Sequence, residues 1–392
     1  MPIGALKNCI YRAALPVLGR RCQWSAPQWE AQAPGVFQHL ARVLKRHYVV
    51  GTAIQVVRQG KLAECYTTGN ARLAPEQAAV RAGTLFRTAS IAKFATALLV
   101  FRLQTLGKLD VSEDISDFLQ YSVRNPRYPE IPITLGMLMS HSSSIIDSPA
   151  YFAALHKGAD LSRLLQDSQA FAQRAPGAAF QYSNLAAGMI ACLLEARFGV
   201  SFEALAQAYL FEPQGACATF DLAAVGEASI ANSYRVLPSG KEPAFDARRR
   251  CRAAMPLLEP DAERHYLLAS GGLLITAESL ARLMLLCLET EPSFLDAKSL
   301  QQMKTPLGQW PEKEVCMRHG MGLLSINDGK ISQRVLYGHQ GFAYGAVNGC
   351  FFTGDGDGFV SLNSGASEAR FGHISLLNRD LIRIFLGDEK RK

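Results

Sequence analysis

The chain has 392 residues, of which 48% are hydrophobic and 19% are charged, and its formal net charge is +7 at pH 7. These proportions are typical of a globular protein with a sizeable core, and they exclude a disordered chain, a collagen-like repeat and a small disulfide scaffold. The longest apolar run, Leu185 to Leu194, ends at Glu195. It is far shorter than the ~20 residues that a bilayer-spanning helix needs.

Residues 1–30 are predicted to be an N-terminal extension. Lys7 and Arg12 interrupt its apolar stretch and no small-residue cleavage site follows, so no secretory signal is predicted. A mitochondrial-type presequence is the alternative, because no acidic residue precedes Glu30. The nine cysteines form no CxxC pair, which favours a reducing compartment where most of them are small buried hydrophobes. We therefore predict a cytoplasmic location.

The hydrophobic pattern predicts helices and strands at both ends of the chain and helices in the middle. The first part contains a helix at 28–46, a hairpin of 51–60 with 62–68, and a long apolar helix at 90–106 that Gly107 closes. Residues 110 to 300 are mostly helical, with examples at 185–196 and 277–287. Strands follow at 333–336, 345–353 and 358–363, and a last helix at 374–386.

This order predicts an α/β (α+β) fold, in which an antiparallel sheet is flanked by N- and C-terminal helices and carries an inserted all-helical domain. The discontinuous α/β domain is predicted to comprise residues 31–110 and 300–392, and the mainly helical domain residues 111–299. A cleft between the two is the expected place for a site. The glycine-rich segment 354–358 lies between two strands, which indicates a hairpin turn and not a calcium or phosphate loop.

The charge pattern gives little support to nucleic acid as a partner. The densest basic run, Arg248 to Arg252, contains no interleaved aromatic residue. A solvated loop is the simpler interpretation, and a docking patch for an anionic substrate or partner is the alternative. No two of the eight histidines lie three to five residues apart, so no helical zinc pair exists and no metal is predicted.

The first chemical motif is Ser90-Ile91-Ala92-Lys93, at the start of the long apolar helix. Residues three apart share a helical face, so the Lys93 amine can reach the Ser90 hydroxyl. Backbone N–H groups at a helix N-terminus favour developing negative charge. Alone the motif is weak, because Ser90 can equally be a helix cap while Lys93 points to solvent.

The second motif is Tyr182-Ser183-Asn184, which opens the helix at Leu185. A Tyr and an Asn two residues apart can both project into a cleft, where the phenol could exchange a proton with a nearby hydroxyl. A loop-anchoring Tyr and a helix-capping Asn are the structural alternatives.

The third motif is Tyr337 to Gly345, with His339 and Gly341 on a strand of the C-terminal part. Small residues on both sides of His339 would let a substrate lie along the backbone. The Phe342 backbone N–H could pair with that of Ser90 as an oxyanion hole. A structural histidine is the alternative interpretation of His339.

The three motifs in this order resemble the serine β-lactamase/penicillin-binding-protein superfamily, over about residues 35 to 388. The branch that holds class C β-lactamases, D-alanyl-D-alanine carboxypeptidases and related esterases is the most similar. Supporting stretches include Phe86 to Ala89, Leu138 to Ser143 and Ser270 to Leu273. Ser144 stands where the family usually has Gly, and His339 replaces the Lys of the β-lactamase Lys-Thr-Gly motif.

The resemblance implies a β-lactamase/transpeptidase-like fold and an acyl-enzyme on Ser90. It implies that Lys93 accepts or relays the serine proton. It also implies that Tyr182 carries a proton to the leaving group and later activates the acyl acceptor. Asn184 would orient the substrate or the Lys93 ammonium, and the Ser90 and Phe342 N–H groups would hold the oxyanion. His339 would shape the pocket with Gly341 and hydrogen-bond the substrate or Tyr182. No cofactor is implied.

The expected substrate is a small acyl compound, and an esterase or amidase is the favoured function. Because a neutral imidazole binds a carboxylate poorly, efficient β-lactam hydrolysis is not expected from His339. An acyltransferase or a D-amino-acid-specific peptidase is the first alternative, and a non-catalytic scaffold or sensor is the second. Nucleic acid and membrane are not predicted as partners, and the sequence leaves homo-oligomer formation open.

Overall fold

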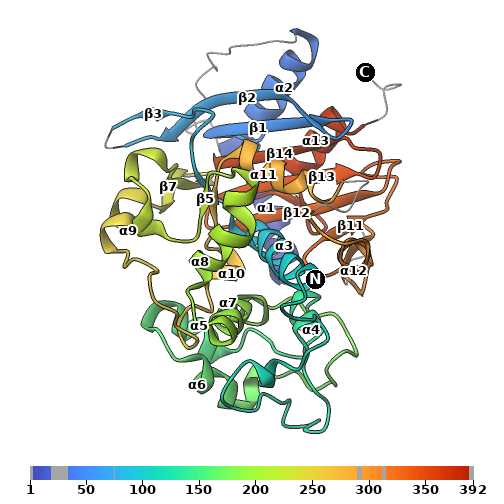
Figure 1. Ribbon diagram of the computed structural model, residues 1–392. Coiled ribbons are helices and arrows are strands. Elements are labelled where there is room, and N and C mark those ends of the chain that lie inside the picture. Colours follow the sequence, from blue (N-terminus) through green and yellow to red (C-terminus); the bar gives the residue numbers. More distant parts are fainter. Residues whose placement is uncertain (1–2, 19–33, 75, 289–293, 311–314, 388–392) are drawn as a thin grey trace.

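The computed structural model describes residues 3–18, 34–74, 76–288, 294–310 and 315–387 (Figure 1). Its central layer is a nine-stranded antiparallel sheet with the order β3-β2-β1-β14-β13-β12-β11-β10-β9. The strands are β1 (Gly51–Arg58), β2 (Lys61–Arg72), β3 (Ala78–Ala79), β9 (Gly308–Gln309), β10 (Met317–His319), β11 (Leu324–Ile326), β12 (Leu336–Ala343), β13 (Ala346–Thr353) and β14 (Gly358–Gly365). Strands from the two ends of the chain meet where β1 pairs with β14. The predicted antiparallel sheet with flanking terminal helices is confirmed.

Alternating side chains of β1 divide the core between the two faces of the sheet, because successive strand residues point to opposite sides. Ile54 and Val56 belong to a cluster with α2 (Pro34–Arg46) and α13 (Leu376–Phe385). Ala53 and Val57 belong to a larger cluster with α3 (Ala92–Thr105) and α11 (Ala277–Leu285). One face therefore carries α2 and α13, and the other leads to the helical region.

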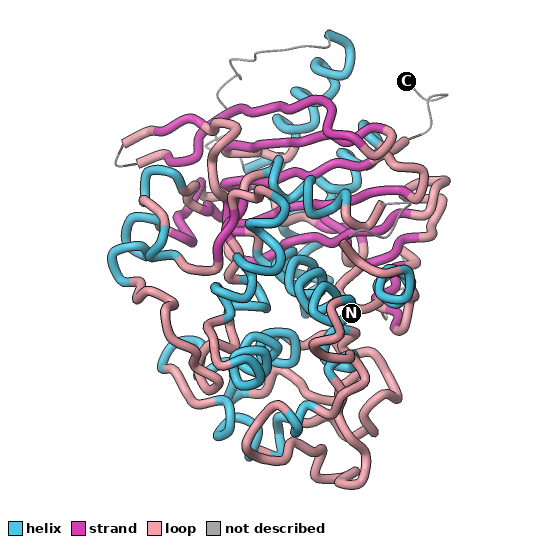
Figure 2. Tube along the Cα trace, in the orientation of Figure 1, coloured by secondary structure: helices cyan, strands magenta, loops and turns pink. Residues whose placement is uncertain are grey.

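The middle of the chain is mainly helical, and Figure 2 shows its helices and loops gathered on one side of the strand layer. The helices are α4 (Leu135–Met139), α5 (Pro149–Lys157), α6 (Leu161–Gln166), α7 (Asn184–Phe198), α8 (Phe202–Ala206), α9 (Ala247–Ala253) and α10 (Leu268–Gly271). Small strands accompany them: β4 (Phe86–Arg87), β5 (Ala218–Thr219), β8 (Leu274–Ile275), and the hairpin of β6 (Ser233–Leu237) with β7 (Gly240–Phe245). The remaining α-helices and strands of the described residues are α1 (Ile3–Leu18), α12 (Ala297–Lys304), β15 (Arg370–Phe371) and β16 (Ile374–Ser375). The domain boundaries at 110 and 300 stay predictions.

Most predicted elements are present within a few residues of their expected ends. Gly107 has a φ of 67° directly after the cap of α3, and segment 354–358 is the turn between β13 and β14. The strand expected at 333–336 is wrong: β12 begins at Leu336 and pairs with β13 over all eight of its positions. Gly338 and Gly341 interrupt the apolar pattern of β12, so the sequence pattern does not reveal it. The strand forms because it pairs with β13. Of the helix expected at 28–46, α2 covers 34–46, and residues 28–33 lie outside the described ranges.

Two expectations about polar side chains need correction. The basic run lies on helix α9 and not in a loop, because Asp246 caps its start, and Arg248 and Arg252 both pair with Glu227. All eight described cysteines are free thiols, and only Cys192, Cys287 and Cys350 are buried. The other five, among them Cys9 on α1 and Cys65 on β2, are exposed or half-buried, so burial of most cysteines is not observed.

No single described helix combines the length and hydropathy needed to span a membrane. One pair of helices, Asn184–Phe198 with Phe202–Gln214, meets that test only jointly, and the two are bent by 89°.

Candidate active site

Ser90 lies on a sharp turn directly before α3. The preceding residue, Ala89, is buried and has a φ of 51°, so the backbone passes through the left-handed region that is unusual for alanine. Ser90 then occupies a short 3-10 turn, Ala89–Ile91, that continues into α3. Its side chain is partly exposed, whereas Ile91 is buried. The turn thus presents the Ser90 hydroxyl at the N-terminal end of a buried helix.

Lys93 lies one turn further along and is 5% exposed. Its Nζ donates to Ser90 Oγ at 3.4 Å, to Asn184 Oδ1 at 3.0 Å and to the Ser270 carbonyl oxygen at 2.6 Å. These three acceptors match the three hydrogens of an ammonium group. The contact with Ser90 Oγ is the longest of the three. Lys93 is therefore placed to take a proton from the serine.

Tyr182 brings a second proton-carrying group to Ser90. Its hydroxyl donates to Ser90 Oγ at 2.8 Å, and Lys93 Nζ lies 5.1 Å from the centre of its ring. The Tyr182 side chain is partly exposed, like that of Ser90. A phenol and an amine therefore flank one accessible hydroxyl, although Tyr182 is far from Ser90 in the sequence.

Asn184 links Lys93 to a carboxylate that the sequence alone does not single out. The Nδ2 of Asn184 donates to Asp147 Oδ2 at 2.9 Å while its Oδ1 accepts from Lys93. The other oxygen of Asp147 accepts from the Ser183 hydroxyl and the Leu185 backbone N–H, both at 2.9 Å. Asp147 thus holds the start of α7 and orients the Asn184 amide, because a reversed amide would present its NH2 group to Lys93.

Strand β12 runs alongside the Ala89–Ile91 turn. β11 pairs only with residues 336–338 of β12, which leaves the rest of this edge free to approach the turn. A Cβ atom on Gly341 would lie 1.9 Å from the Thr88 carbonyl oxygen, so glycine is required for the approach. The next residue, Phe342, is therefore held close to the turn, where an oxyanion hole needs a second N–H donor.

Three buried histidines form a cluster beside Tyr182. The ring centre of His141 lies 4.3 Å from that of Tyr182, His319 lies 4.7 Å from His141, and His339 lies 5.9 Å from His319. Burial, together with the Lys93 charge, lowers the pKa of all three imidazoles, that of His319 to about 4. The histidine cluster is therefore uncharged at neutral pH.

His339 is expected to hydrogen-bond the substrate or Tyr182, and that role stays a prediction. Its Nδ1 lies 2.8 Å from the Gln340 carbonyl oxygen, and its Nε2 has no hydrogen-bond partner among the described residues. Among the ring contacts of the described residues, the one between Tyr182 and this cluster is made by His141. His141 stands in a stretch that supports the family resemblance, but its contact depends on the fold. No three His, Cys, Asp or Glu side chains in the described ranges are arranged to hold a metal ion.

Phe180 and Trp310 extend the ring of Tyr182 into an apolar surface, which we call the aromatic wall. Ring centres lie 5.2 Å apart between Tyr182 and Trp310, and 5.1 Å apart between Phe180 and Trp310. All three side chains are partly exposed. No sequence motif marks Trp310, because it reaches the site through the fold from the end of β9.

Comparison with known protein families identifies the family to which this chain belongs. The model of the Beta-lactamase family matches residues 36–370, so the chain belongs to that family, whose members are serine hydrolases and acyl transferases. One curated relative, the probable fimbrial assembly protein FimD, serogroup H1, of Dichelobacter nodosus, is 25% identical over 193 residues. The match covers 48% of this chain and 47% of that relative, so the matched region spans about half of each.

Several solved structures share the fold. The octameric penicillin-binding protein homologue from Pyrococcus abyssi has a TM-score of 0.70 and 20% identity, over 91% of this chain and 78% of that one. EstCE1, a hydrolase with promiscuous acyltransferase activity, has a TM-score of 0.71 and 19% identity, over 88% and 98%. The D-amino acid amidase from Ochrobactrum anthropi SV3, complexed with D-phenylalanine, has a TM-score of 0.65 and 18% identity, over 89% and 97%. At these identities the likeness shows the β-lactamase/transpeptidase-like fold.

Proposed function

We propose that this protein is a serine hydrolase that cleaves esters of small molecules through an acyl-enzyme on Ser90. The observation that carries the proposal is the position of Ser90 Oγ, 2.8 Å from the Tyr182 hydroxyl and 3.4 Å from Lys93 Nζ. A serine hydroxyl is a weak nucleophile unless a neighbouring group accepts its proton. Here two such groups are within reach.

In the proposed reaction Ser90 Oγ attacks the substrate carbonyl carbon while Lys93 takes the serine proton, a step that needs the molecules in which the Lys93 amine has lost its own proton. Tyr182 gives its proton to the departing alkoxide as the carbon–oxygen bond breaks. Water then attacks the acyl-enzyme, Tyr182 recovers a proton from it, and the Lys93 ammonium returns its proton to Ser90. The backbone N–H groups of Ser90 and Phe342 hold the oxyanion in both steps.

The surroundings of Ser90 favour an apolar, uncharged substrate. His339 stands where the resemblance places the carboxylate-binding Lys of β-lactamases, and its buried imidazole is neutral because burial lowers its pKa. A neutral imidazole offers little attraction to an antibiotic carboxylate. The aromatic wall of Phe180, Tyr182 and Trp310 can instead cover an apolar acyl or alcohol group.

Acyl transfer is the second candidate, and the similarity to EstCE1, a hydrolase with promiscuous acyltransferase activity, favours it. Both reactions use the same acyl-enzyme and differ only in whether water or an alcohol attacks it. A D-amino-acid-specific peptidase is a related alternative, since a D-amino acid amidase shares the fold.

Purified protein and Ser90→Ala are assayed with p-nitrophenyl acetate and butyrate, a D-phenylalanine amide and a chromogenic cephalosporin. We expect rapid ester hydrolysis that requires Ser90, with slow turnover of the cephalosporin. Adding a primary alcohol shows how the acyl-enzyme divides between water and the alcohol. Transfer to the alcohol yields a new ester, whereas hydrolysis yields the free acid. Turnover of the amide alone would favour the peptidase, and a folded protein that forms no acyl-enzyme would favour the non-catalytic scaffold.

A further inference from the structure

Three helices carry nearly all of the net positive charge of the chain. Helices α1, α2 and α13 together hold seven Lys and Arg residues and one Asp, a net +6 out of the total of +7. The cations are Lys7, Arg12, Arg42, Lys45, Arg46, Arg379 and Arg383. The one carboxylate, Asp380, is buried; it contacts His47 and forms ion pairs with Arg46, Arg379 and Arg383. We call the outer surface of these three helices the basic face.

The three helices are neighbours on one side of the molecule. α2 and α13 pack on the same face of the sheet. α1 is tied to them because Tyr48, just after α2, donates to the Leu15 carbonyl oxygen. Burial lowers the pKa of Arg379; the Asp380 carboxylate opposes this shift, and the nearby charges of Arg383 and of Arg12 from α1 add to it. Cations of different helices thus lie close enough to repel each other.

Helix α1 adds an exposed apolar stripe to the basic face. Leu6, Ile10 and Val17 are 53%, 59% and 70% exposed, and their spacing of four and seven residues puts them on one side of the helix. The opposite side of α1 is attached to the rest of the protein by hydrogen bonds. Asn8 exchanges two hydrogen bonds with the Arg370 backbone, and Tyr11 donates to the Val236 carbonyl oxygen. The apolar stripe is therefore held facing outward.

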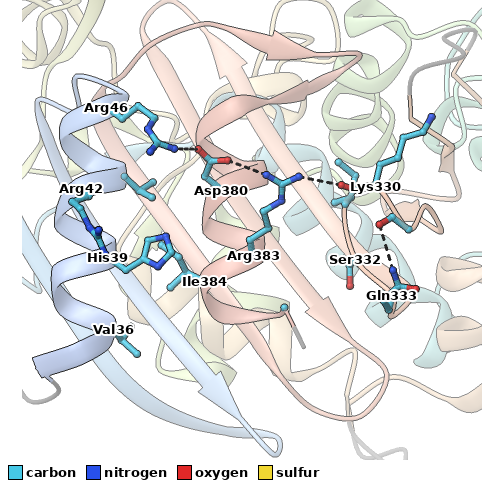
Figure 3. A pocket seen from close by; sticks show the side chains of 14 residues that line it. Val36, His39, Arg42, Arg46, Lys330, Ser332, Gln333, Asp380, Arg383 and Ile384 are labelled. Carbon is cyan, nitrogen blue, oxygen red and sulfur yellow. Dashed lines mark hydrogen bonds and ion pairs between the residues drawn. The ribbon is translucent and has the colours of Figure 1, made fainter. Parts of the chain in front are cut away.

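A cavity of about 1050 Å³ opens between α2, α13 and residues 329–333 on the same side of the molecule (Figure 3). Figure 3 shows Arg42 and Arg46 on α2 and Arg383 on α13 along its walls, with Val36 and Ile384 among the apolar lining residues. Arg46 and Arg383 both pair with Asp380, and Arg383 also donates to the Lys330 carbonyl oxygen. The cavity thus combines cationic and apolar walls.

We propose that the basic face binds the surface of an anionic lipid bilayer. The apolar stripe of α1 would enter the boundary between headgroups and acyl chains, and the cations of α2 and α13 would contact lipid phosphates. An exposed apolar stripe has no use in nucleic-acid binding by phosphate contacts, which leaves lipid as the partner that matches both features. A helix that lies on the membrane surface does not have to cross the bilayer. The short apolar runs of this sequence therefore argue against a spanning helix but not against binding at the surface. Ser90 lies on the turn directly before α3, a helix that packs with the opposite face of the sheet. Docking through the basic face therefore leaves the site open to solvent.

The test is sedimentation of the full chain with vesicles of phosphatidylcholine, alone or mixed with phosphatidylglycerol, at low and high salt. Leu6→Glu/Ile10→Glu changes the apolar stripe, and Arg42→Glu/Lys45→Glu reverses two exposed charges of α2. The matched controls are Leu258→Glu, at another exposed apolar side chain, and Arg127→Glu/Arg163→Glu, at two exposed cations of the helical region. Hydrolysis of a soluble ester by each variant shows that it is folded.

We expect binding to the anionic vesicles only, lost at high salt, and at least tenfold weaker in each basic-face variant than in the controls. Three results would overturn the proposal: no sedimentation with anionic vesicles at low salt, equal binding to neutral vesicles, or equal loss in the control variants. A fourth contrary result is a wild-type oligomer that becomes a monomer in Leu6→Glu/Ile10→Glu. In that case a second copy of the chain, and not a lipid surface, would cover the apolar stripe.

Discussion

The Tyr182 hydroxyl lies 2.8 Å from Ser90 Oγ, nearer than the Lys93 amine at 3.4 Å. We therefore expect Tyr182→Phe to lower kcat/KM for a p-nitrophenyl ester by about 10²- to 10⁴-fold, the usual contribution of a general acid–base group. The phenylalanine ring keeps its contacts with His141 and Trp310, so stability should change little. Tyr128→Phe is the control, since that hydroxyl reaches only the Gln173 carbonyl oxygen at the surface. Equal activities of the two variants would remove Tyr182 from the reaction.

Asp147 is predicted to act through Asn184 as a positioning residue. Asp147→Asn replaces an acceptor of three hydrogen bonds by an amide, so the Asn184 side chain loses its fixed orientation toward Lys93. We expect at least a tenfold fall in the acylation rate. The cycle of Asp147→Asn, Asn184→Ala and the double variant measures the coupling.

If Asp147 works through Asn184, the double variant should acylate no more slowly than Asn184→Ala alone. Its pH profile of kcat/KM should also match that of Asn184→Ala. Losses that multiply in the double variant would show that Asp147 only supports the start of α7.

Gly341 is predicted to be required for the approach of β12 to the nucleophile turn. In Gly341→Ala the new Cβ would meet the Thr88 carbonyl oxygen at 1.9 Å, so β12 must shift away and the Phe342 N–H would move with it. Loss of one oxyanion donor typically costs about 10²- to 10³-fold in kcat, and overpacking costs about 1–3 kcal/mol of stability. Gly354→Ala is the matched control, because its Cβ would meet nothing within 4 Å. An active, stable Gly341→Ala would contradict this account of the strand.

The histidine cluster predicts loss of stability in mild acid. The pKa of His319 is lowered to about 4 in the folded protein by burial, whereas an unfolded chain titrates near 6.5. The unfolded state then binds more protons at intermediate pH, so this contribution to the free energy of unfolding is complete above about pH 6.5. It decreases as pH falls toward 4. His319 alone should account for roughly 2 kcal/mol between about pH 7.5 and pH 5.

The contribution is isolated by comparing urea unfolding of wild type and His319→Asn at both pH values. The asparagine amide can still donate to the Gly320 carbonyl oxygen, which His319 Nδ1 contacts. His265 has the opposite sign, because its hydrogen bond with Glu195 raises its pKa, and the comparison cancels its effect. We expect a smaller loss in the variant. Equal losses would mean that His319 does not carry the acid sensitivity.

Local spacing explains which site residues could be predicted from the sequence. Ser90 and Lys93 share one helical turn, and Tyr182 and Asn184 are two residues apart at the start of α7, so each pair could be recognised as a motif. Asp147, His319 and Trp310 meet them only through tertiary packing, for which the sequence has no local signal. Ser144 stands where glycine is expected and yet has a φ of 65°, with its hydroxyl accepting from Asn125. Its conformation could not be inferred from residue type.

The fold could be predicted to a similar extent. Strongly patterned segments such as α3 and the β1–β2 hairpin were recognisable, because their apolar spacing is regular. Strands β9, β10 and β11 and the β6–β7 hairpin are short or polar, and they exist because neighbouring strands pair with them. The outward face of α1 was likewise not evident from hydropathy, since it depends on which side Asn8 and Tyr11 attach.

The central claim is that Ser90 forms a covalent acyl-enzyme. Wild type, Ser90→Ala and Ser142→Ala are treated with a fluorophosphonate probe, and the intact mass and the labelled peptide are determined. The account predicts one adduct per chain on Ser90 in wild type and Ser142→Ala, and none in Ser90→Ala. Labelling that persists in Ser90→Ala, or an adduct on another residue of the wild type, would contradict it.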